Sequence, residues 1–377
     1  MLIQQLCLEN YRNIQQLSLS PGPGVNVIYG DNAQGKTNLV EALWLFTGAK
    51  SFRGVREKEL MRFGSGRTEA SVRFWCAGRE QTASFTWTAE PGGSVRRELL
   101  LNEVPQDNAS RLSGRFFAVV FSPAHLSLAK DGPELRRRFL DTALCQLIPK
   151  YEGSLREYRR ILTQRNALLK DLSRYPQLQD TLEVWDEHLA RAGAAVTCCR
   201  ARYVVHAARL AGEVYAGMSG GKEAFSLRYA GFAGPEADQI PLEELRAQLL
   251  SQLRERRAQD IDHGMTMTGP HRDDLVLELD GAPVRLYGSQ GQQRSCVLSL
   301  KMAECAMIEE TVGEAPVILL DDVMSELDAA RRDYLLNQIK GRQVFVTCCD
   351  RESFAGLEDG LCFPIEAGAL LDPAKEE

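Results

Sequence analysis

The stretch from Val25 to Thr37 constrains the fold of this chain more than any other. A short apolar run over 25–29 is followed by the octapeptide Gly30-Asp31-Asn32-Ala33-Gln34-Gly35-Lys36-Thr37. The octapeptide fits the pattern G-x-x-x-x-G-K-[ST], which forms a loop between a β-strand and an α-helix and binds phosphate through its backbone N–H groups. The sequence therefore predicts a strand over 25–29 and a helix over 38–46, with Leu39, Leu43 and Phe46 on one face.

We expect the whole of this loop, 30–37, to bind a nucleotide. Lys36 supplies a positive charge over the β- and γ-phosphates, and the Thr37 hydroxyl can hold Mg²⁺. The helix that begins here also turns its positive end toward the same anion. A chance glycine-rich turn is the alternative, but the flanking strand and helix are those that the motif requires.

Composition sets broad limits. The 377 residues are 44% hydrophobic and 25% charged, which is typical of a globular protein of about two domains. We find neither a secretory leader nor an apolar run near 18 residues, and so expect a cytoplasmic protein without a membrane partner. The net charge of −6 argues against a generally basic nucleic-acid binder but allows a local basic patch. Ten scattered cysteines without zinc-like spacing favour reduced thiols.

The pattern along the chain predicts an α/β core interrupted by helices. Strands are expected over 2–8 and 14–19, over 70–75, 81–88 and 94–101 as an antiparallel sheet beside the nucleotide site, and over 116–121 as a buried strand. Helices are expected over 135–147, 151–172, 178–218 and 242–258, with a short strand over 225–232 among them. We therefore expect a head domain in two parts, 1–122 and 264–377, and an inserted helical arm over 123–263.

The core resumes after 264. A strand over 275–279 is expected to turn at Asp280-Gly281 into a second strand over 284–286. A polar loop (288–294), a helix (295–311), an apolar strand (317–320), a helix (331–339), a second apolar strand (343–347) and a frayed tail after 367 follow.

Two acidic residues end an apolar strand. Val317-Ile318-Leu319-Leu320 is followed by Asp321-Asp322, and polar groups emerge beside ligands at the carboxyl ends of buried parallel strands. We expect Asp321 to reach Mg²⁺ together with Thr37, and Asp322 to orient or deprotonate the attacking water. Taken alone, the pair could also be two solvated acids at a strand end.

A second candidate phosphate contact lies at Ser289-Gln290-Gly291-Gln292. Ser289 can cap the following helix, and Gly291 permits close approach of the backbone to an anion. An ordinary polar loop with an N-cap is the alternative.

The order of these motifs resembles that of the ABC-type ATPases, in the branch of the chromosome-maintenance and DNA-repair heads. Within it the chain is most similar to the RecF family of bacterial recombination mediators. This resemblance also rests on 10–13, 50–53, 121–123, 136–141, 268–274 and the D-loop-like 325–328. It implies an α/β fold: an ABC-type ATPase head, with a mixed sheet and an antiparallel subdomain, carrying an inserted helical domain.

The resemblance implies a slow ATPase that acts as a switch and an ATP-dependent homodimer. Ser289, Gly291 and Gln292 of one copy would cover ATP held by the other copy's phosphate loop, and Arg12 would face the nucleotide. Arg12 could instead be a surface arginine after a turn. The implied partners are DNA (gapped, single- and double-stranded), RecR and RecO, acting on RecA at gaps in recombinational repair and replication restart.

Two departures from the family pattern are visible. Asp322 lies where ABC ATPases commonly have Glu. Its side chain is one methylene shorter, which fits slow hydrolysis. No switch histidine follows the last apolar strand; Thr347-Cys348-Cys349-Asp350 is found there, and Asp350 or a threonine could substitute. A Q-loop glutamine is not identifiable. His271 is interpreted as a hydrogen-bonded structural histidine rather than a metal or pH-sensing group.

Charge alone does not reveal a DNA site. Residues 130–165 hold nine basic and five acidic residues, whereas 303–330 hold eight acids and no base. The basic residues of 130–165 could contact phosphates or simply form solvated helix faces. A transporter nucleotide-binding subunit is the alternative function, disfavoured by the long, Arg-rich insertion. Intact Lys36, Thr37 and Asp321 disfavour a non-catalytic scaffold.

Overall fold

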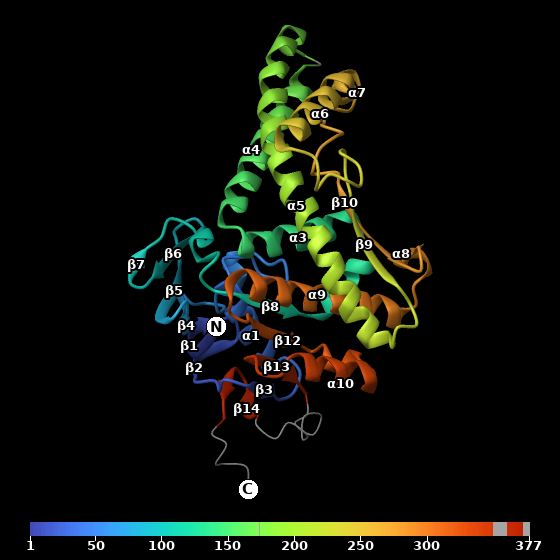
Figure 1. Ribbon diagram of the computed structural model, residues 1–377. Helices are drawn as coiled ribbons and strands as arrows, with labels where there is room; N and C mark the ends of the chain where they lie inside the picture. Colours follow the sequence, from blue (N-terminus) through green and yellow to red (C-terminus); the bar gives the residue numbers. More distant parts are fainter. Residues whose placement is uncertain (173, 350–359, 372–377) are drawn as a thin grey trace. The chain divides into compact units, whose positions relative to one another are not determined.

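The computed structural model describes residues 1–172, 174–349 and 360–371. The chain forms two compact units (Figure 1): unit 1 comprises Met1–Ser127 and Lys301–Glu377, and unit 2 comprises Leu128–Leu300. Unit 2 thus includes 264–300, which we had expected in the head. The reason is strand pairing: β10 (Asp274–Leu279) pairs antiparallel with β9 (Phe225–Ala230), which lies among the arm helices in the sequence.

A largely parallel sheet forms one layer of unit 1. Its strand order is β15-β14-β3-β13-β12-β8, with all neighbours parallel except β15 and β14. The strands are β3 (Val25–Tyr29), β8 (Ala118–Phe121), β12 (Val317–Asp321), β13 (Val344–Cys348), β14 (Leu361–Glu366) and β15 (Ala369–Leu370). Every residue of β8, β12 and β13 is buried, as expected for strands covered on both faces.

The second sheet of unit 1 is antiparallel, in the order β2-β1-β4-β5-β6-β7. Its strands are β1 (Leu2–Tyr11), β2 (Ile14–Leu19), β4 (Arg67–Cys76), β5 (Arg79–Ala89), β6 (Val95–Leu101) and β7 (Val104–Pro105). Alternate residues of β4 are buried, so one face meets the core. The antiparallel sheet predicted over 70–101 is confirmed, and the structure adds β1 and β2 to it.

Helix α1 (Lys36–Leu45) directly follows the phosphate loop. Just beyond its end, Phe46 packs against Phe85 and Phe116, with ring centroids 5.4 and 5.9 Å apart. Tilted aromatic pairs at this spacing add specific packing energy to burial. The remaining helices with residues in this unit are α2 (Pro123–Leu126), α10 (Ala329–Gln338), part of α9 (Gln290–Val312) and the 3₁₀ turns η1 (Glu57–Leu60), η2 (Ala109–Leu112), η3 (Ser127–Ala129) and η5 (Met324–Glu326).

Unit 2 is mainly helical. Its elements are α3 (Pro133–Leu147), α4 (Pro149–Asp171), η4 (Pro176–Thr181), α5 (Leu182–Ser219), α6 (Leu242–Glu255), α7 (Arg257–His263), α8 (Val284–Tyr287) and the small sheet β11-β10-β9, where β11 is Ala282–Pro283. The 38-residue α5 packs against both α4 and α6 (Figure 1). Among the described residues, no helix is long and apolar enough to span a membrane.

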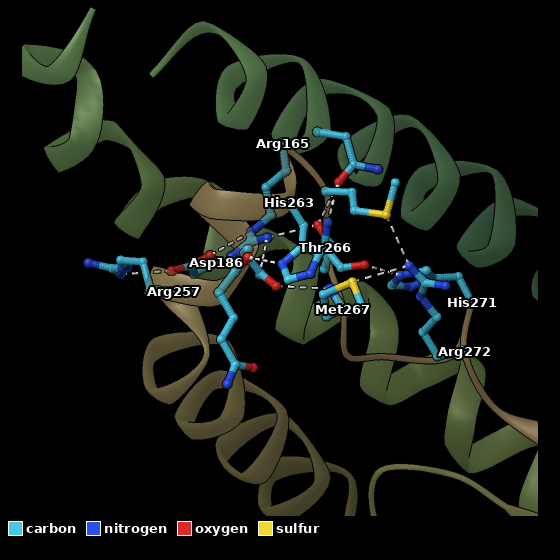
Figure 2. A network of polar contacts seen from close by, with 12 residues as sticks. Arg165, Asp186, Arg257, His263, Thr266, Met267, His271 and Arg272 are labelled. Atoms are coloured by element: carbon cyan, nitrogen blue, oxygen red, sulfur yellow. Dashed lines mark hydrogen bonds and ion pairs between the residues drawn. The ribbon is translucent and has the colours of Figure 1, made fainter. Parts of the chain in front are cut away.

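A buried polar network joins the helices of unit 2 (Figure 2). Arg165 is fully buried and donates to Asp186 and Asp260, each at 2.7 Å, and to the Thr266 hydroxyl at 2.8 Å. Beside it, His271 donates from Nε2 to the Thr266 carbonyl (2.9 Å) and accepts at Nδ1 from the Tyr158 hydroxyl (2.6 Å). Burial lowers the pKa of His271 to about 4, so the neutral ring has the structural role that we predicted.

Three local expectations were wrong. The second strand expected over 284–286 is a helical turn, since β11 stops at Pro283, which lacks an N–H. The polar loop expected over 288–294 is mostly helix, because α9 begins at Gln290. Strand β14 was missed because Pro364 interrupts its apolar pattern. Of the tail expected to fray after 367, Ala369–Leu370 form β15 and pair with β14, whereas residue 350 and residues 372–377 lie outside the described residues.

Candidate nucleotide-binding site

The phosphate loop connects β3 to α1 as the sequence predicted. Gly30 (φ 151°) and Gly35 (φ 115°) both adopt conformations that side chains rarely allow. A Cβ at Gly30 would lie 2.3 Å from the Ile365 carbonyl oxygen, and one at Gly35 would lie 3.0 Å from Asn13 Oδ1. Glycine is therefore required at both positions by backbone conformation and by space.

Lys36 folds back over the loop that precedes it. Its side chain is nearly buried, and Nζ donates to the carbonyl oxygens of Gly30 and Asp31, the latter at 2.9 Å. Cys349 Sγ lies 3.6 Å from the same nitrogen. The ammonium group is therefore held inside the loop, where it can neutralise a bound phosphate.

The structure brings the loop threonine to the acidic strand end. The Thr37 hydroxyl donates to Asp321 Oδ1 at 2.8 Å, and the Thr347 hydroxyl donates to the same oxygen at 3.0 Å. Burial raises the pKa of Asp321, while these two hydrogen bonds oppose the rise. A hydroxyl and a carboxylate side by side are hard oxygen ligands of the kind that Mg²⁺ prefers, so these residues fit the predicted metal.

Asp322 lies beside this group with a different exposure. Its backbone has φ 52°, and its N–H donates to Thr347 Oγ1 at 2.9 Å. Its carboxylate is exposed and accepts from the Ser325 hydroxyl at 3.2 Å. The Thr347 hydroxyl thus contacts both residues: it donates to the Asp321 carboxylate and accepts from the Asp322 backbone N–H. Sequence reasoning named a threonine only as a possible substitute for the missing histidine, and the signal was its place at the end of an apolar strand.

Arg12 pairs with a buried carboxylate of α1. Its Nε and Nη2 each donate to Glu41 at 2.8 Å, and Glu41 also accepts from the hydroxyls of Tyr11 and Ser51. The Glu41 side chain is fully buried. Arg12 is therefore a structural partner of α1, the helix that follows the phosphate loop. Sequence reasoning missed Glu41 because nothing local to it signals a buried acid.

A chain of side-chain hydrogen bonds flanks the phosphate loop. Arg53 Nη1 donates to Asn38 Oδ1 at 2.9 Å, Asn38 Nδ2 donates to Asn13 Oδ1 at 2.8 Å, and Asn13 Nδ2 donates to the Ala33 carbonyl at 3.3 Å. Arg53 is exposed, and its charge opposes the rise that burial causes in the pKa of Asp321. The segments 10–13 and 50–53 therefore converge on the phosphate loop.

The remaining predicted contacts lie in unit 2. Ser289 forms a capping box with Gln292: the Gln292 N–H donates to Ser289 Oγ at 3.2 Å, and the Ser289 N–H donates to Gln292 Oε1 at 2.7 Å. Gly291 lies in the first turn of α9 between them. The cap predicted at Ser289 is confirmed, and it explains why the helix begins at Gln290.

Comparison with known proteins identifies the chain's relatives. A family model described as the RecF/RecN/SMC N terminal domain matches residues 2–362. The DNA replication and repair protein RecF of Agathobacter rectalis is 39% identical over 354 residues, covering 94% of each chain. That of Heliobacterium modesticaldum is 40% identical over 375 residues, covering 98% of this chain and 99% of the relative.

Solved structures agree. A structure of the recombination mediator protein RecF-ATPrS in the RecFOR pathway has a TM-score of 0.89 at 32% identity and covers 98% of this chain and 97% of that chain. The Smc head domain of Pyrococcus furiosus has a TM-score of 0.55 at 17% identity, covers 98% of this chain and 95% of that chain, and so shares the fold. The expected ABC-type ATPase head fold is confirmed. On these matches in sequence and structure, the chain belongs to the RecF family.

Proposed function

We propose that this protein is an ATP-dependent DNA-binding protein of recombinational repair and replication restart, which helps to load recombinase at single-strand gaps. The observation that carries the proposal is the 2.8 Å hydrogen bond from Thr37 to Asp321, which joins the phosphate loop to the acidic strand end. Membership of the RecF family supports the repair function and gives no support to the transporter alternative.

The residues divide the chemistry as follows. The loop 30–37 binds the phosphates, Lys36 neutralises their charge, and Thr37 with Asp321 holds Mg²⁺. Bound Mg²⁺ would supply charge neutralisation at the phosphate oxygens. Asp322 orients or deprotonates the attacking water, and its exposed, short carboxylate fits slow hydrolysis to ADP and phosphate. The Arg12–Glu41 pair fixes α1 and leaves 15% of the Arg12 side chain exposed for contact with nucleotide.

ATP closes a homodimer in this proposal. Ser289, Gly291 and Gln292 of one copy cover ATP held by the other copy, and the capping box presents the Ser289 hydroxyl at the start of α9. The dimer then binds DNA through its phosphates and its shape, without a base code. RecR and RecO, acting on RecA, are the partners that the family resemblance suggests.

Sedimentation tests the nucleotide sandwich. With ATP and Mg²⁺ the protein should dimerise, and Lys36→Met should abolish dimerisation by preventing phosphate binding. Ser289→Arg should also abolish it while leaving nucleotide binding to the monomer intact. A wild-type protein that stays monomeric with ATP, ADP and no nucleotide would refute the sandwich.

Two further measurements test the switch and the DNA partner. Asp322→Asn should slow turnover and accumulate the ATP dimer; unchanged turnover would assign water activation to another residue. Binding of the ATP-loaded protein to gapped duplex should weaken steeply as salt rises. Binding to detergent-solubilised membrane partners instead of DNA would favour a transporter subunit.

A further inference from the structure

The side chain of Gln292 uses both ends of its carboxamide. Oε1 accepts from the Ser289 N–H at 2.7 Å, and Nε2 donates to Glu223 Oε1 at 2.6 Å. A carboxamide placed between two polar groups can adopt either of two flipped orientations. Only one satisfies both neighbours here, because the carboxylate of Glu223 is an acceptor and the Ser289 N–H is a donor.

Glu223 is itself anchored to the arm. It lies between the end of α5 at Ser219 and the start of β9 at Phe225. Its Oε2 accepts from the Tyr215 hydroxyl at 2.5 Å. Tyr215 belongs to α5, is 1% exposed and stacks on Phe225 with ring centroids 5.5 Å apart. The Glu223 carboxylate is therefore held by a buried tyrosine of α5.

These contacts form a continuous relay within unit 2, from Tyr215 through Glu223 and Gln292 to Ser289. Charge-assisted hydrogen bonds such as that to Glu223 are stronger than neutral ones. Without Glu223, the Gln292 amide loses its fixed orientation, and the capping box that orients Ser289 loses its support.

We propose that Glu223 is a positioning residue for dimer closure: by fixing the Gln292 carboxamide it presents Ser289 to nucleotide held by a second copy, and it ties that presentation to the arm helix α5. This inference rests on the proposed ATP-dependent dimer. Glu223 does not touch the nucleotide and acts only through Gln292.

The test is the ATP concentration at half-maximal dimerisation, measured by sedimentation. Glu223→Ala should weaken closure about tenfold at each of the two Ser289-containing loops, hence about a hundredfold in the dimerisation constant, as expected for loss of a charged hydrogen bond. The ATP concentration needed for half-maximal dimerisation should rise accordingly. Tyr215→Phe keeps the carboxylate and should have a smaller effect. The matched control is Glu213→Ala, an exposed α5 residue paired with Arg209, which should behave as wild type.

Three readouts separate positioning from general loss of structure. Fluorescent-ATP binding, measured in a Ser289→Arg background that cannot dimerise, should be unchanged by Glu223→Ala. The thermal midpoint should match that of Glu213→Ala. In the double variant Glu223→Gln with Gln292→Glu, the new amide at 223 donates to the new carboxylate at 292, which still accepts from the Ser289 N–H. The double variant should therefore dimerise better than Gln292→Glu alone, in which two carboxylates face each other.

The possible results distinguish the positioning role of Glu223 from the proposed function. If wild type dimerises with ATP and Glu223→Ala does so at the same ATP concentration, the positioning role is refuted while the proposed function stands. If Glu223→Ala weakens monomer nucleotide binding or folding to the same extent as dimerisation, the role is structural and the inference fails. If wild type itself never dimerises, the proposed function fails and takes this inference with it.

Discussion

Replacing Arg165 by methionine should destabilise unit 2 by about 3 kcal/mol, because breaking a buried ion pair from one side leaves an uncompensated charge. The Arg165, Asp186 and Asp260 side chains are all fully buried. Two remaining contacts limit the loss: Asp186 keeps Arg257 at 2.7 Å (Figure 2), and Asp260 keeps the Met267 N–H at 2.9 Å. We therefore expect the low end of the usual range of about 3–5 kcal/mol.

Two smaller contributions to this loss of stability oppose each other. The Thr266 hydroxyl loses its bond to Arg165, worth about 1 kcal/mol. Among the described residues Arg165 Nη2 is buried without a hydrogen-bond partner, and removing that unsatisfied group returns a similar amount. The two terms nearly cancel, and the uncompensated carboxylates dominate.

Hydrogen exchange with mass spectrometry is the appropriate assay, because it reports opening free energies segment by segment. Peptides of α4 and α5 should lose about 3 kcal/mol of protection, whereas peptides of β3 and α1 in unit 1 should not change. Arg191→Met is the control: Arg191 and Glu157 are 60% and 42% exposed, and such a pair is worth at most about 1 kcal/mol. A loss below about 1 kcal/mol for Arg165→Met would refute the reasoning.

Three further predictions concern pH and the nucleotide site. In Asp273→Asn the free energy of unfolding of unit 2 should rise with pH between about 4 and 6.5, because burial lowers the pKa of His271 from 6.5 to about 4. In this range His271 is protonated in the unfolded chain but neutral in the folded one, so raising the pH favours the folded state. In His271→Asn the free energy of unfolding should fall with pH between 3.8 and about 6, because burial raises the pKa of Asp273 to about 6. Urea melts at a series of pH values check both signs. Equal slopes of unfolding free energy against pH in the two variants would contradict them. Arg12→Met should destabilise unit 1 by about 3 kcal/mol through the buried Glu41, and Arg12→Met with Glu41→Met should recover much of it; a denaturant series that shows no recovery would mean that the loss does not come from leaving Glu41 unpaired. Thr347→Val should weaken Mg²⁺-dependent ATP binding and slow turnover severalfold without unfolding the protein, since it removes the hydroxyl that donates to the Asp321 carboxylate and accepts from the Asp322 N–H; unchanged kinetics would show that the site does not need this hydroxyl.

The predictable part of the site depends on short-range pattern. The octapeptide 30–37 and the run ending in Asp321-Asp322 each contain, within a few residues, the glycines, lysine and acids that their chemistry needs. Their pairing across Thr37 and Asp321 could be expected because parallel strands place their carboxyl ends at one edge of a sheet. The Ser289 cap was likewise predictable from the residue type, although the polar residues after it obscured the start of α9.

Other contacts depend on partners distant in the chain. By itself, the sequence determined the phosphate loop, the acidic strand end, the helical character of the arm and the family, because local spacing and periodicity carry that information. Only the tertiary structure decided that Arg12 faces Glu41, that Thr347 joins the two acids, that Glu223 orients Gln292, and that 264–300 belongs to unit 2. The physical reason is that a buried polar group must find a partner wherever the fold brings one, and sequence separation says nothing about where that is.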